Sequence, residues 1–284
     1  MKAGITFLTL QFLLFACAKP EKTIEASTPV VEANQFKLPP ATLVQAIQEE
    51  FPGALPYEEG IDSLVAHLER VGIPANTILW GQSTCVDDIT NTKDKFFHPE
   101  IKGPFNFGGL AGLPFTGITG LDAFAHHVPE HGTALLFIGP HIGYDAKDGW
   151  GKIIRHEQHH ASSCCGALSA ALAKLQKGEL KQQVPTEEDY QQGVLEQLTY
   201  QHREELLSAK EPLVALTKLT YLEAKKQMTT YVPKVKERHF KYAVVVGGII
   251  INTNYDFPDY LWIERISILD IQKNVWVEGG KLIE

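Results

Sequence analysis

Two short apolar runs, each followed closely by a metal-binding side chain, constrain the fold of this chain more than any other feature. Residues 133–138 form the first run, which stops at Gly139-Pro140 and is followed directly by His141. Far upstream, residues 77–80 form the second run, which leads through a glycine to Cys85. Apolar runs of this length, stopped by Gly or Pro, predict buried strands that deliver the residues after them to one edge of a sheet.

A third ligand comes from the vicinal thiols Cys164 and Cys165, which precede a helix pattern of small residues. Two thiolates and one imidazole are a typical Zn2+ ligand set, and three protein ligands leave the fourth position to water. The sequence therefore predicts a zinc site on Cys85, His141 and one of the two vicinal cysteines. Asp87 lies two residues after Cys85, where its carboxylate can orient a bound hydroxide.

The residues around these ligands resemble a known family. The Cys-x-Asp of Cys85 and Asp87, the Gly-Pro-His that ends at His141 and the Cys-Gly-Ala that begins at Cys165 are similar to the zinc motifs of β-class carbonic anhydrases. Longer stretches resemble the limiting-CO2-inducible protein B/C family, also called θ-class carbonic anhydrases; they are residues 108–117, 125–129, 139–143 and 163–167. The likeness is strong over residues 80–172 and weaker over residues 250–259.

The resemblance implies an α/β fold of the β-carbonic-anhydrase type. It implies zinc on Cys85, His141 and Cys165, because the Cys-Gly-Ala motif favours the second vicinal thiol. It also implies a homodimer that hydrates CO2 reversibly to bicarbonate, with a zinc-bound hydroxide as the nucleophile and Asp87 as the orienting carboxylate.

Two departures from the β-class pattern bear on activity. β-Class enzymes carry an Arg two residues after the Asp, where this chain has Ile89, and their His and second Cys lie much closer together in the sequence. Either Arg155 or Lys93 then has to hold Asp87. Otherwise Asp87 fills the fourth zinc position and closes the site.

Helical and strand patterns interleave along the chain, which predicts an α/β architecture with a central mixed β-sheet flanked by helices. Apolar residues with a helical period occur at 43–51, 61–71, 121–127, 167–175, 186–207 and 213–222, and a capping box at Thr186 and Asp189 opens the fifth stretch. Strand patterns occur at 77–80, 134–138, 242–251, 261–269 and 275–277. Five glycines from Gly108 to Gly120 carry no phosphate-binding motif and predict a loop that turns sharply or approaches a neighbour closely.

Residues 1–17 predict a bacterial lipoprotein signal, because Lys2 precedes an apolar stretch that ends in Leu-Phe-Ala-Cys at Cys17, the expected lipidation site. The stretch is too short for a comfortable bilayer span, and the alternatives are an uncleaved N-terminal anchor or a buried helix. Residues 18–37 then form a flexible tether, and residues 38–284 form the zinc domain. These features predict an exported protein, at the periplasmic face or cell surface of a bacterium, that meets the membrane only through its lipid.

The net charge bears on the class of binding partner, and the number of cysteines bears on whether disulfides or a metal are present. A net charge of −8 without a basic stripe argues against nucleic acid. Four cysteines leave three once Cys17 is lipidated, so at least one thiol lies outside any intramolecular disulfide. Zinc would explain why Cys85 and Cys165 stay reduced in an oxidising compartment, with Cys164 as a buried neighbour of the site. The alternative is a disulfide from Cys85 to Cys164 or Cys165 without a metal.

Histidines elsewhere leave further hypotheses open. His126 and His127 are either structural or, as the resemblance suggests, placed beside the metal site to transfer protons. The run His156-Glu157-Gln158-His159-His160 satisfies the zincin pattern. On a helix, His156 and His160 would bind zinc, with Glu157 as general base and Glu179 as a candidate third ligand. A metalloprotease is therefore an alternative, as is a catalytically silent zinc-binding relative of carbonic anhydrases that acts as a binding or scaffold protein.

Overall fold

One large mixed sheet forms the centre of the protein in the computed structural model, which describes residues 36–90 and 98–279. Within these residues the order of the main strands is β1-β10-β9-β4-β2-β3. Their bounds are β1 Leu55–Pro56, β2 Ile78–Ser83, β3 Lys102–Asn106, β4 Thr133–Ile138, β9 Tyr242–Asn252 and β10 Tyr260–Asp270. β4 runs parallel to β2 and β9, and β2 runs parallel to β3, while β10 is antiparallel to β9 and β1. The predicted central mixed sheet is confirmed.

Shorter strands extend this sheet. β11 (Val275–Glu278) pairs with β10 in antiparallel orientation, and β5 (His141–Asp145) pairs with β9 in parallel orientation. β6 (Gly149–Trp150) forms a hairpin with β5. β7 (Lys152–Ile153) and β8 (Ser162–Ser163) form a separate antiparallel pair, which leads the chain from the β5 hairpin to the vicinal cysteines.

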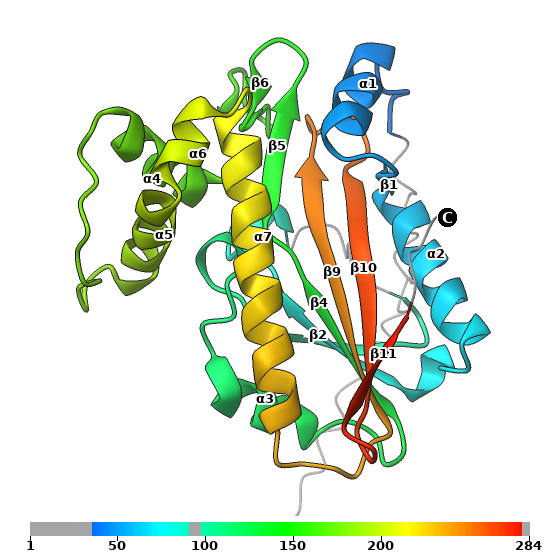
Figure 1. Ribbon diagram of the computed structural model, residues 1–284. Coiled ribbons are helices and arrows are strands. Elements are labelled where there is room, and N and C mark those ends of the chain that lie inside the picture. The colour runs from blue at the N-terminus through cyan, green and yellow to red at the C-terminus, as the bar shows by residue number, and fades with distance from the viewer. Residues whose placement is uncertain (1–35, 91–97, 280–284) are drawn as a thin grey trace, which may run out of the picture. The chain divides into compact units, whose positions relative to one another are not determined.

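Helices cover both faces of the sheet, as the sequence predicts (Figure 1). They are α1 Ala41–Glu50, α2 Tyr57–Arg70, α3 Gly117–Ala125, α4 Gly166–Gln176, α5 Tyr190–Gln201, α6 Arg203–Ser208 and α7 Pro212–Tyr231. The 3-10 turns are Ala75–Thr77, Asp88–Thr90, Leu110–Gly112 and Val232–Lys234.

The two faces follow from the alternation of side chains along each strand. In β4, Leu135 and Phe137 join the core beneath α2, whereas Leu136 and Ile138 join the core beneath α7. Every residue of β4 is buried, as expected of a central strand covered on both sides. Each fully buried Leu or Phe contributes roughly 1.5–3 kcal/mol relative to an exposed one, so this strand is firmly held.

A break between β4 and β5 places His141. Both strands pair with the same edge of β9: β4 with its first half, up to Gly247, and β5 from Ile250 onward. At the break, a Cβ on Gly139 would lie 2.7 Å from the carbonyl oxygen of Gly248, so only glycine permits this close approach. The break ends the pairing of β4 with β2 and leaves His141 facing the residues that follow β2.

The structure differs from the predicted elements in several regions. The helix expected from Thr186 begins only at Tyr190, because Gln183 runs alongside α5 and bonds with Glu196 and Gln197 there instead of leading into the helix. That helix also ends at Gln201, so residues 186–207 hold two helices, not one. Strands β3 and β5 were not expected, since neither has an alternating pattern of useful length.

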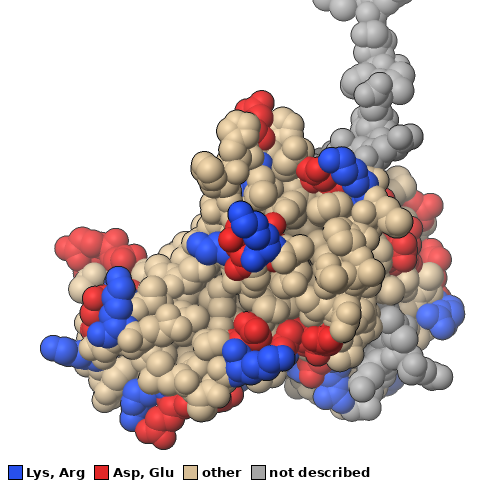
Figure 2. All heavy atoms as spheres, turned by 90° about the horizontal axis from the view of Figure 1, so that it is seen from above, with Lys and Arg blue, Asp and Glu red and all other residues tan. Residues whose placement is uncertain are grey.

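The described residues belong to one compact unit, Phe36–Glu284. The signal segment 1–17 with Cys17, and the tether 18–37 except for Phe36 and Lys37, lie outside the described residues. Lys37 is held at the surface by an ion pair with Asp256. Among the described helices, none combines the length and the apolar character that a bilayer crossing requires. On the face shown in Figure 2, basic and acidic side chains are interspersed.

Candidate metal centre

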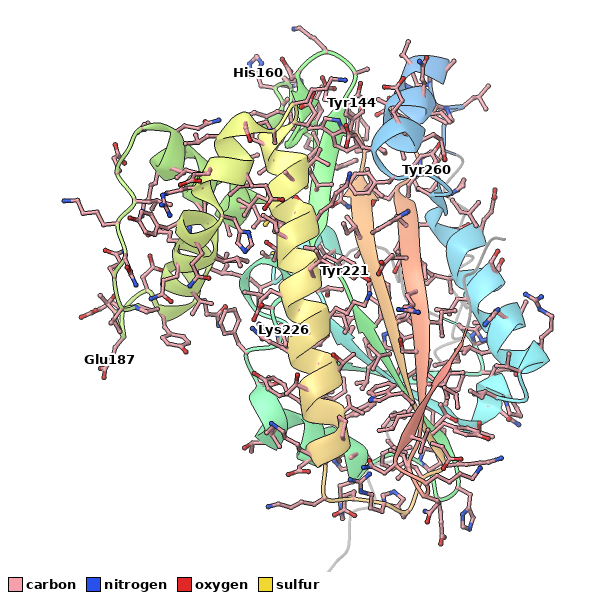
Figure 3. All side chains as sticks on the ribbon, viewed as in Figure 1. Tyr144, His160, Glu187, Tyr221, Lys226 and Tyr260 are labelled. Atoms are coloured by element: carbon pink, nitrogen blue, oxygen red, sulfur yellow. The ribbon has the colours of Figure 1, made fainter. Side chains whose placement is uncertain are left out.

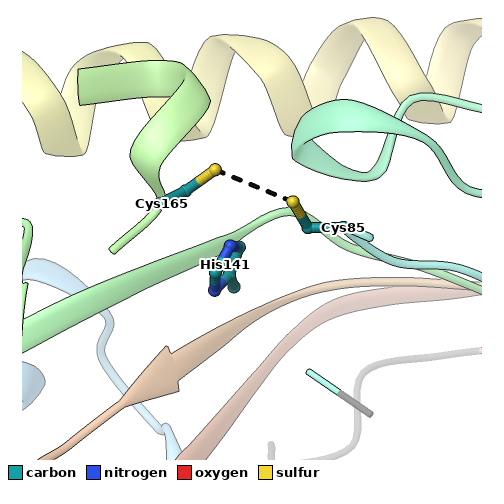
Figure 4. Close-up of side chains that lie close together, drawn as sticks. All are labelled: Cys85, His141 and Cys165. Carbon is teal, nitrogen blue, oxygen red and sulfur yellow. Dashed lines mark hydrogen bonds between the residues drawn. The ribbon is translucent and has the colours of Figure 1, made fainter. Parts of the chain in front are cut away.

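Three elements deliver three buried ligands to one point. Cys85 follows the carboxyl end of β2, His141 opens β5 after the Gly139 break, and Cys165 is the N-cap of α4. Their ligand atoms all lie within 4.8 Å of one another (Figure 4). Within residues 36–90 and 98–279, this is the one group of three such ligands that can hold a metal ion.

The donor atoms fit a metal ion in both spacing and chemistry. The Sγ atoms of Cys85 and Cys165 are 3.8 Å apart. Two sulfurs bound tetrahedrally to Zn2+ at about 2.3 Å would lie about 3.8 Å apart. The separation is far longer than a disulfide bond of about 2.05 Å, and all three described cysteines are free thiols, so the alternative disulfide is not formed. His141 Nε2 is buried without a hydrogen-bond partner in the described part of the chain, as a ligand nitrogen would be.

The electrostatics of the site also favour a cation. Hydrogen bonding from Cys165 outweighs burial and, together with His141, lowers the pKa of Cys85 to about 4. The same contact and burial raise the pKa of Cys165. Burial opposes a charge on His141, but the sulfurs of Cys164 and Cys165 outweigh it and raise the pKa of His141. The sulfurs therefore attract positive charge, which a metal ion supplies when it displaces their protons.

The glycine-rich loop reaches Cys85 through its backbone. The N–H of Ala111 donates a hydrogen bond of 3.3 Å to Cys85 Sγ. The loop lies so close to β2 that a Cβ on Gly108 would meet the carbonyl oxygen of Thr84 at 1.9 Å. The close backbone approach predicted for these glycines therefore occurs, and it brings an N–H donor to a candidate metal ligand.

A chain of hydrogen bonds through Asn252 and Asp259 orients the imidazole of His141 at its Nδ1 nitrogen. His141 Nδ1 lies 2.8 Å from Asn252 Oδ1, and Asn252 Nδ2 donates a hydrogen bond of 2.9 Å to Asp259 Oδ2. Cys164 is not in the ligand group; its Sγ lies 3.5 Å from Asn252 Oδ1 and 3.5 Å from His141 Nδ1. The sequence analysis did not identify Asn252 and Asp259 as site residues. The position of Asn252 could have indicated it, because Asn252 comes at the end of the apolar run of β9, just as Cys85 and His141 come after those of β2 and β4.

Asp87 lies beside the candidate ligands and accepts hydrogen bonds from Arg155. Arg155 Nη2 donates to both carboxylate oxygens of Asp87 at 2.9 Å each, and Nη1 donates to Asp88 Oδ1 at 2.6 Å. Asp87 Oδ2 is 3.9 Å from His141 Nε2. Of the two basic residues considered from the sequence, Arg155 makes the contact, and Lys93 lies outside the described residues.

The surroundings keep Asp87 ionised. Burial raises its pKa, but hydrogen bonding with Asp88, the charge of His141 and the Arg155 guanidinium outweigh burial and lower the pKa below its ordinary value of 3.8. Arg155 takes both oxygens of Asp87, and Asp87 is not in the group of mutually close ligand atoms. Asp87 is therefore held next to the group of three candidate ligand atoms and is not a member of it.

The comparisons with known proteins decide the family. A family model described as limiting CO2-inducible proteins B/C β-carbonic anhydrases matches residues 54–270. The chain belongs to this family.

Solved structures agree with the assignment of the chain to the limiting CO2-inducible protein B/C family. PtLCIB4, described as a homolog of the limiting CO2-inducible protein LCIB, is 30% identical, with a TM-score of 0.73 over 83% of this chain and 98% of that chain. LCIB itself is 22% identical, with a TM-score of 0.63 over 82% of this chain and 96% of that chain, which shows the same fold. No curated protein matches the chain. The family resemblance noted in the motifs is confirmed.

In this member of the family, His126 and His127 lie away from the ligand group. Both are exposed at the end of α3, and His126 Nδ1 is 3.7 Å from Glu237 in the segment that leads into β9. That segment precedes the amino end of β9, whereas the candidate ligands lie toward the carboxyl ends of the parallel strands. The structure therefore does not bring His126 and His127 to the candidate metal centre.

The zincin pattern of this family member does not form a helix. Residues 156–160 are an exposed turn, and Glu157 has φ +62°, a left-handed conformation that no α-helix contains. His156 is 77% exposed and Glu157 is 85% exposed. Figure 3 shows His160 at the outer end of the molecule, near β6. The metalloprotease alternative is therefore not favoured, although Arg155, which precedes this run, reaches the candidate site.

Proposed function

We propose that this chain is a zinc-dependent carbonic anhydrase, which converts CO2 and water reversibly to bicarbonate and a proton. The observation that carries the proposal is the contact of Arg155 Nη2 with both carboxylate oxygens of Asp87, beside the group of three ligand atoms. A carboxylate occupied by a guanidinium leaves the fourth metal position to solvent, and a solvent position is what distinguishes a catalytic zinc site from a structural one.

Cys85, His141 and Cys165 would hold the zinc, which when bound lowers the pKa of a coordinated water to about 7 in the best-studied case. The remaining tasks belong to side chains of this chain. Asp87 accepts a hydrogen bond from the attacking water and orients its lone pair toward CO2. Hydrogen bonding with Asp88, the charge of His141 and the hydrogen bonds from Arg155 together lower the pKa of Asp87 and keep it ionised.

The backbone of the glycine-rich loop supports the same chemistry. Two thiolates cancel the charge of a divalent ion, which weakens its effect on the pKa of water. The N–H of Ala111 draws negative charge from the sulfur of Cys85 and so offsets part of that loss. We therefore assign Ala111 a supporting role through its main chain.

The cellular setting is also a proposal. The Leu-Phe-Ala-Cys sequence at Cys17 supports export as a membrane-anchored bacterial lipoprotein. The family resemblance supports a homodimer. CO2 and bicarbonate are then the molecules that the protein binds, and the protein contacts the membrane only through its lipid anchor.

A stopped-flow assay of CO2 hydration on the zinc-loaded chain tests the proposal. We expect hydration above the buffer rate, and we expect Cys85→Ser to lose both the metal and the activity. Glu157→Ala is the control: its side chain is exposed and outside the ligand group, so activity stays unchanged. A wild-type chain that binds zinc but does not hydrate CO2 would instead be a catalytically silent relative, and the proposed activity would be wrong.

A further inference from the structure

The chain of hydrogen bonds behind His141 has a defined direction. Asp259 Oδ1 accepts from the backbone N–H of Thr253 at 2.8 Å, and Asp259 Oδ2 accepts from the side chain of Asn252 at 2.9 Å. A carboxylate only accepts hydrogen bonds, so the group of Asn252 that faces Asp259 has to be its NH2. The oxygen of the Asn252 amide is thereby turned toward His141.

The direction of the amide decides which nitrogen of His141 carries a proton. Asn252 Oδ1 can only accept, and it lies 2.8 Å from His141 Nδ1. His141 Nδ1 therefore carries the N–H of the neutral imidazole, and the lone pair is on Nε2. Nε2 is the nitrogen that lacks a hydrogen-bond partner among the described residues and lies on the side of Asp87.

The burial of the whole chain makes this arrangement stable. His141 and Asn252 are fully buried, and Cys164, also fully buried, adds a second donor toward Asn252 Oδ1 at 3.5 Å. Reversing the amide would set its NH2 against the Nδ1–H of His141 and its oxygen against the carboxylate of Asp259. Buried polar groups without partners are costly, so the reversed arrangement is excluded as long as Asp259 is a carboxylate.

We propose that Asp259 is a positioning residue for the metal centre, which acts through Asn252 to present the Nε2 lone pair of His141. Asp259 lies in the turn before β10 and is separated from His141 by the side chain of Asn252. The inference rests on the proposed function only in so far as the site binds zinc. It adds that a residue in the β9–β10 turn determines how strongly His141 binds the metal.

The test is zinc affinity, measured on the full-length chain by competition with a chromophoric chelator. Asp259→Asn removes the obligatory acceptor and lets the amide of Asn252 rotate, and we expect affinity to fall about 10- to 100-fold, as is typical when a partner of a metal-binding His is lost. Asp256→Asn is the matched control, because it changes the same charge in the same turn, where Asp256 pairs with Lys37 and does not touch the site. We expect Asp256→Asn to bind zinc like the wild type.

A double variant separates positioning from a merely structural role. Asn252→Asp combined with Asp259→Asn reverses the pair: the new carboxylate accepts from His141 Nδ1–H, and the new amide donates to that carboxylate while its oxygen still accepts from Thr253. The net charge is unchanged, and we expect zinc affinity to return to within a few-fold of the wild type.

Three results would overturn the inference or its basis, and they are distinguishable. Wild-type affinity in Asp259→Asn means that the carboxylate does not position His141. A loss in Asp259→Asn that the double variant does not restore means that Asp259 acts in folding alone. A wild-type chain that binds no zinc overturns the proposed function itself, and the inference falls with it.

Discussion

Asp87 is held by a guanidinium that comes from a distant part of the chain. Arg155 lies 68 residues away and contacts both oxygens of the carboxylate, while the neighbouring motif position holds Ile89. A guanidinium suits this task because it is always charged and carries several N–H donors: Nη2 donates to both oxygens of Asp87 while Nη1 donates to Asp88. In this chain the guanidinium that contacts Asp87 therefore comes from the loop between β7 and β8.

Replacing Arg155 should separate metal binding from activity. In Arg155→Met we expect zinc to be retained, because the three ligands are unchanged, and CO2 hydration to fall about 10²-fold, because a catalytic group loses its position. Without the guanidinium the pKa of Asp87 rises. Its carboxylate form is then lost at a higher pH as the solution is acidified, and the acid limb of the kcat/KM profile moves to higher pH.

Arg203→Met is the control for this substitution, because Arg203 lies on α6 and stacks on Tyr200. Arg155→Lys keeps the charge but loses the second nitrogen, which bonds Asp88, and should give an intermediate rate. The measurements are the zinc content of each variant and its pH–rate profile. Wild-type activity in Arg155→Met would show that Asp87 does not depend on this contact.

The sequence was sufficient to identify some residues of the candidate site and not others, and the difference has a physical reason. Cys85, His141 and Cys165 follow apolar runs or open a helix, so the sheet topology alone brings them together. Arg155 remained one of two candidates, because a long side chain on a loop can point in many directions. Asn252 was not predicted, because its partners depend on the strand register between β5 and β9.

At the scale of elements, the glycine-rich loop is positioned by contact with the turn that follows β2. A Cβ on Gly108 would lie 1.9 Å from the Thr84 oxygen, and Thr84 directly precedes Cys85. Backbone atoms cannot rotate away as a flexible side chain can. A substitution here therefore has to move either the loop, with its N–H donor to Cys85, or the ligand turn itself.

Gly108→Ala should therefore destabilise the fold and weaken the metal site. We expect a loss of about 1–3 kcal/mol, the usual cost of overpacking, together with lower zinc affinity. Gly166→Ala is the matched control, because Gly166 also adjoins a candidate ligand, but a Cβ there meets nothing within 4 Å. Gly166 is the first residue of α4, where Ala is the better helix former, so the free energy of unfolding of Gly166→Ala should equal or exceed that of the wild type.

Urea unfolding of both variants, followed by far-ultraviolet circular dichroism, measures the difference. Equal midpoints for the two alanine variants, together with wild-type zinc affinity in both, would contradict the close approach of the loop. A stable Gly108→Ala with weakened zinc binding would show that the loop moves instead of the ligand turn.

Element boundaries show where sequence patterns stop being informative. The apolar periods of α1, α2 and α4 are regular, and these helices form close to where they were predicted; α7 begins as predicted but continues to Tyr231, beyond the predicted stretch 213–222. The start of α5 was wrong, because the hydrogen bonds of Gln183 to the side of that helix overrule a capping pattern. β5 was not predicted, because its pairing depends on a break at Gly139 that only the packing against Gly248 explains.

At the scale of the whole molecule, the candidate ligands join three segments that are remote in sequence. Cys85 and Cys165 are 80 residues apart, and they connect the end of β2 to the start of α4 across the face of the sheet that α7 also covers. A metal bound there crosslinks these segments in the folded state and has no comparable site in the unfolded chain. Metal binding should therefore contribute directly to folding stability.

Removing the metal should lower the melting temperature of the whole domain. At free zinc of about 1,000 times the Kd, binding stabilises the fold by about 4 kcal/mol. At about 2–4 °C per kcal/mol for a domain of this size, a strong chelator should lower the Tm by about 8–16 °C. Differential scanning calorimetry with and without the chelator measures this shift.

Cysteine variants make the thermal experiment specific to the site. Cys85→Ser and Cys165→Ser should melt at temperatures that the chelator no longer changes, because each lacks a ligand. Cys164→Ser should keep the full shift, because Cys164 faces Asn252 and is not in the ligand group. If Cys164→Ser lost the shift and Cys165→Ser kept it, the vicinal thiols would have exchanged roles. A wild-type Tm unaffected by verified zinc removal would mean that the three segments are held together by packing alone.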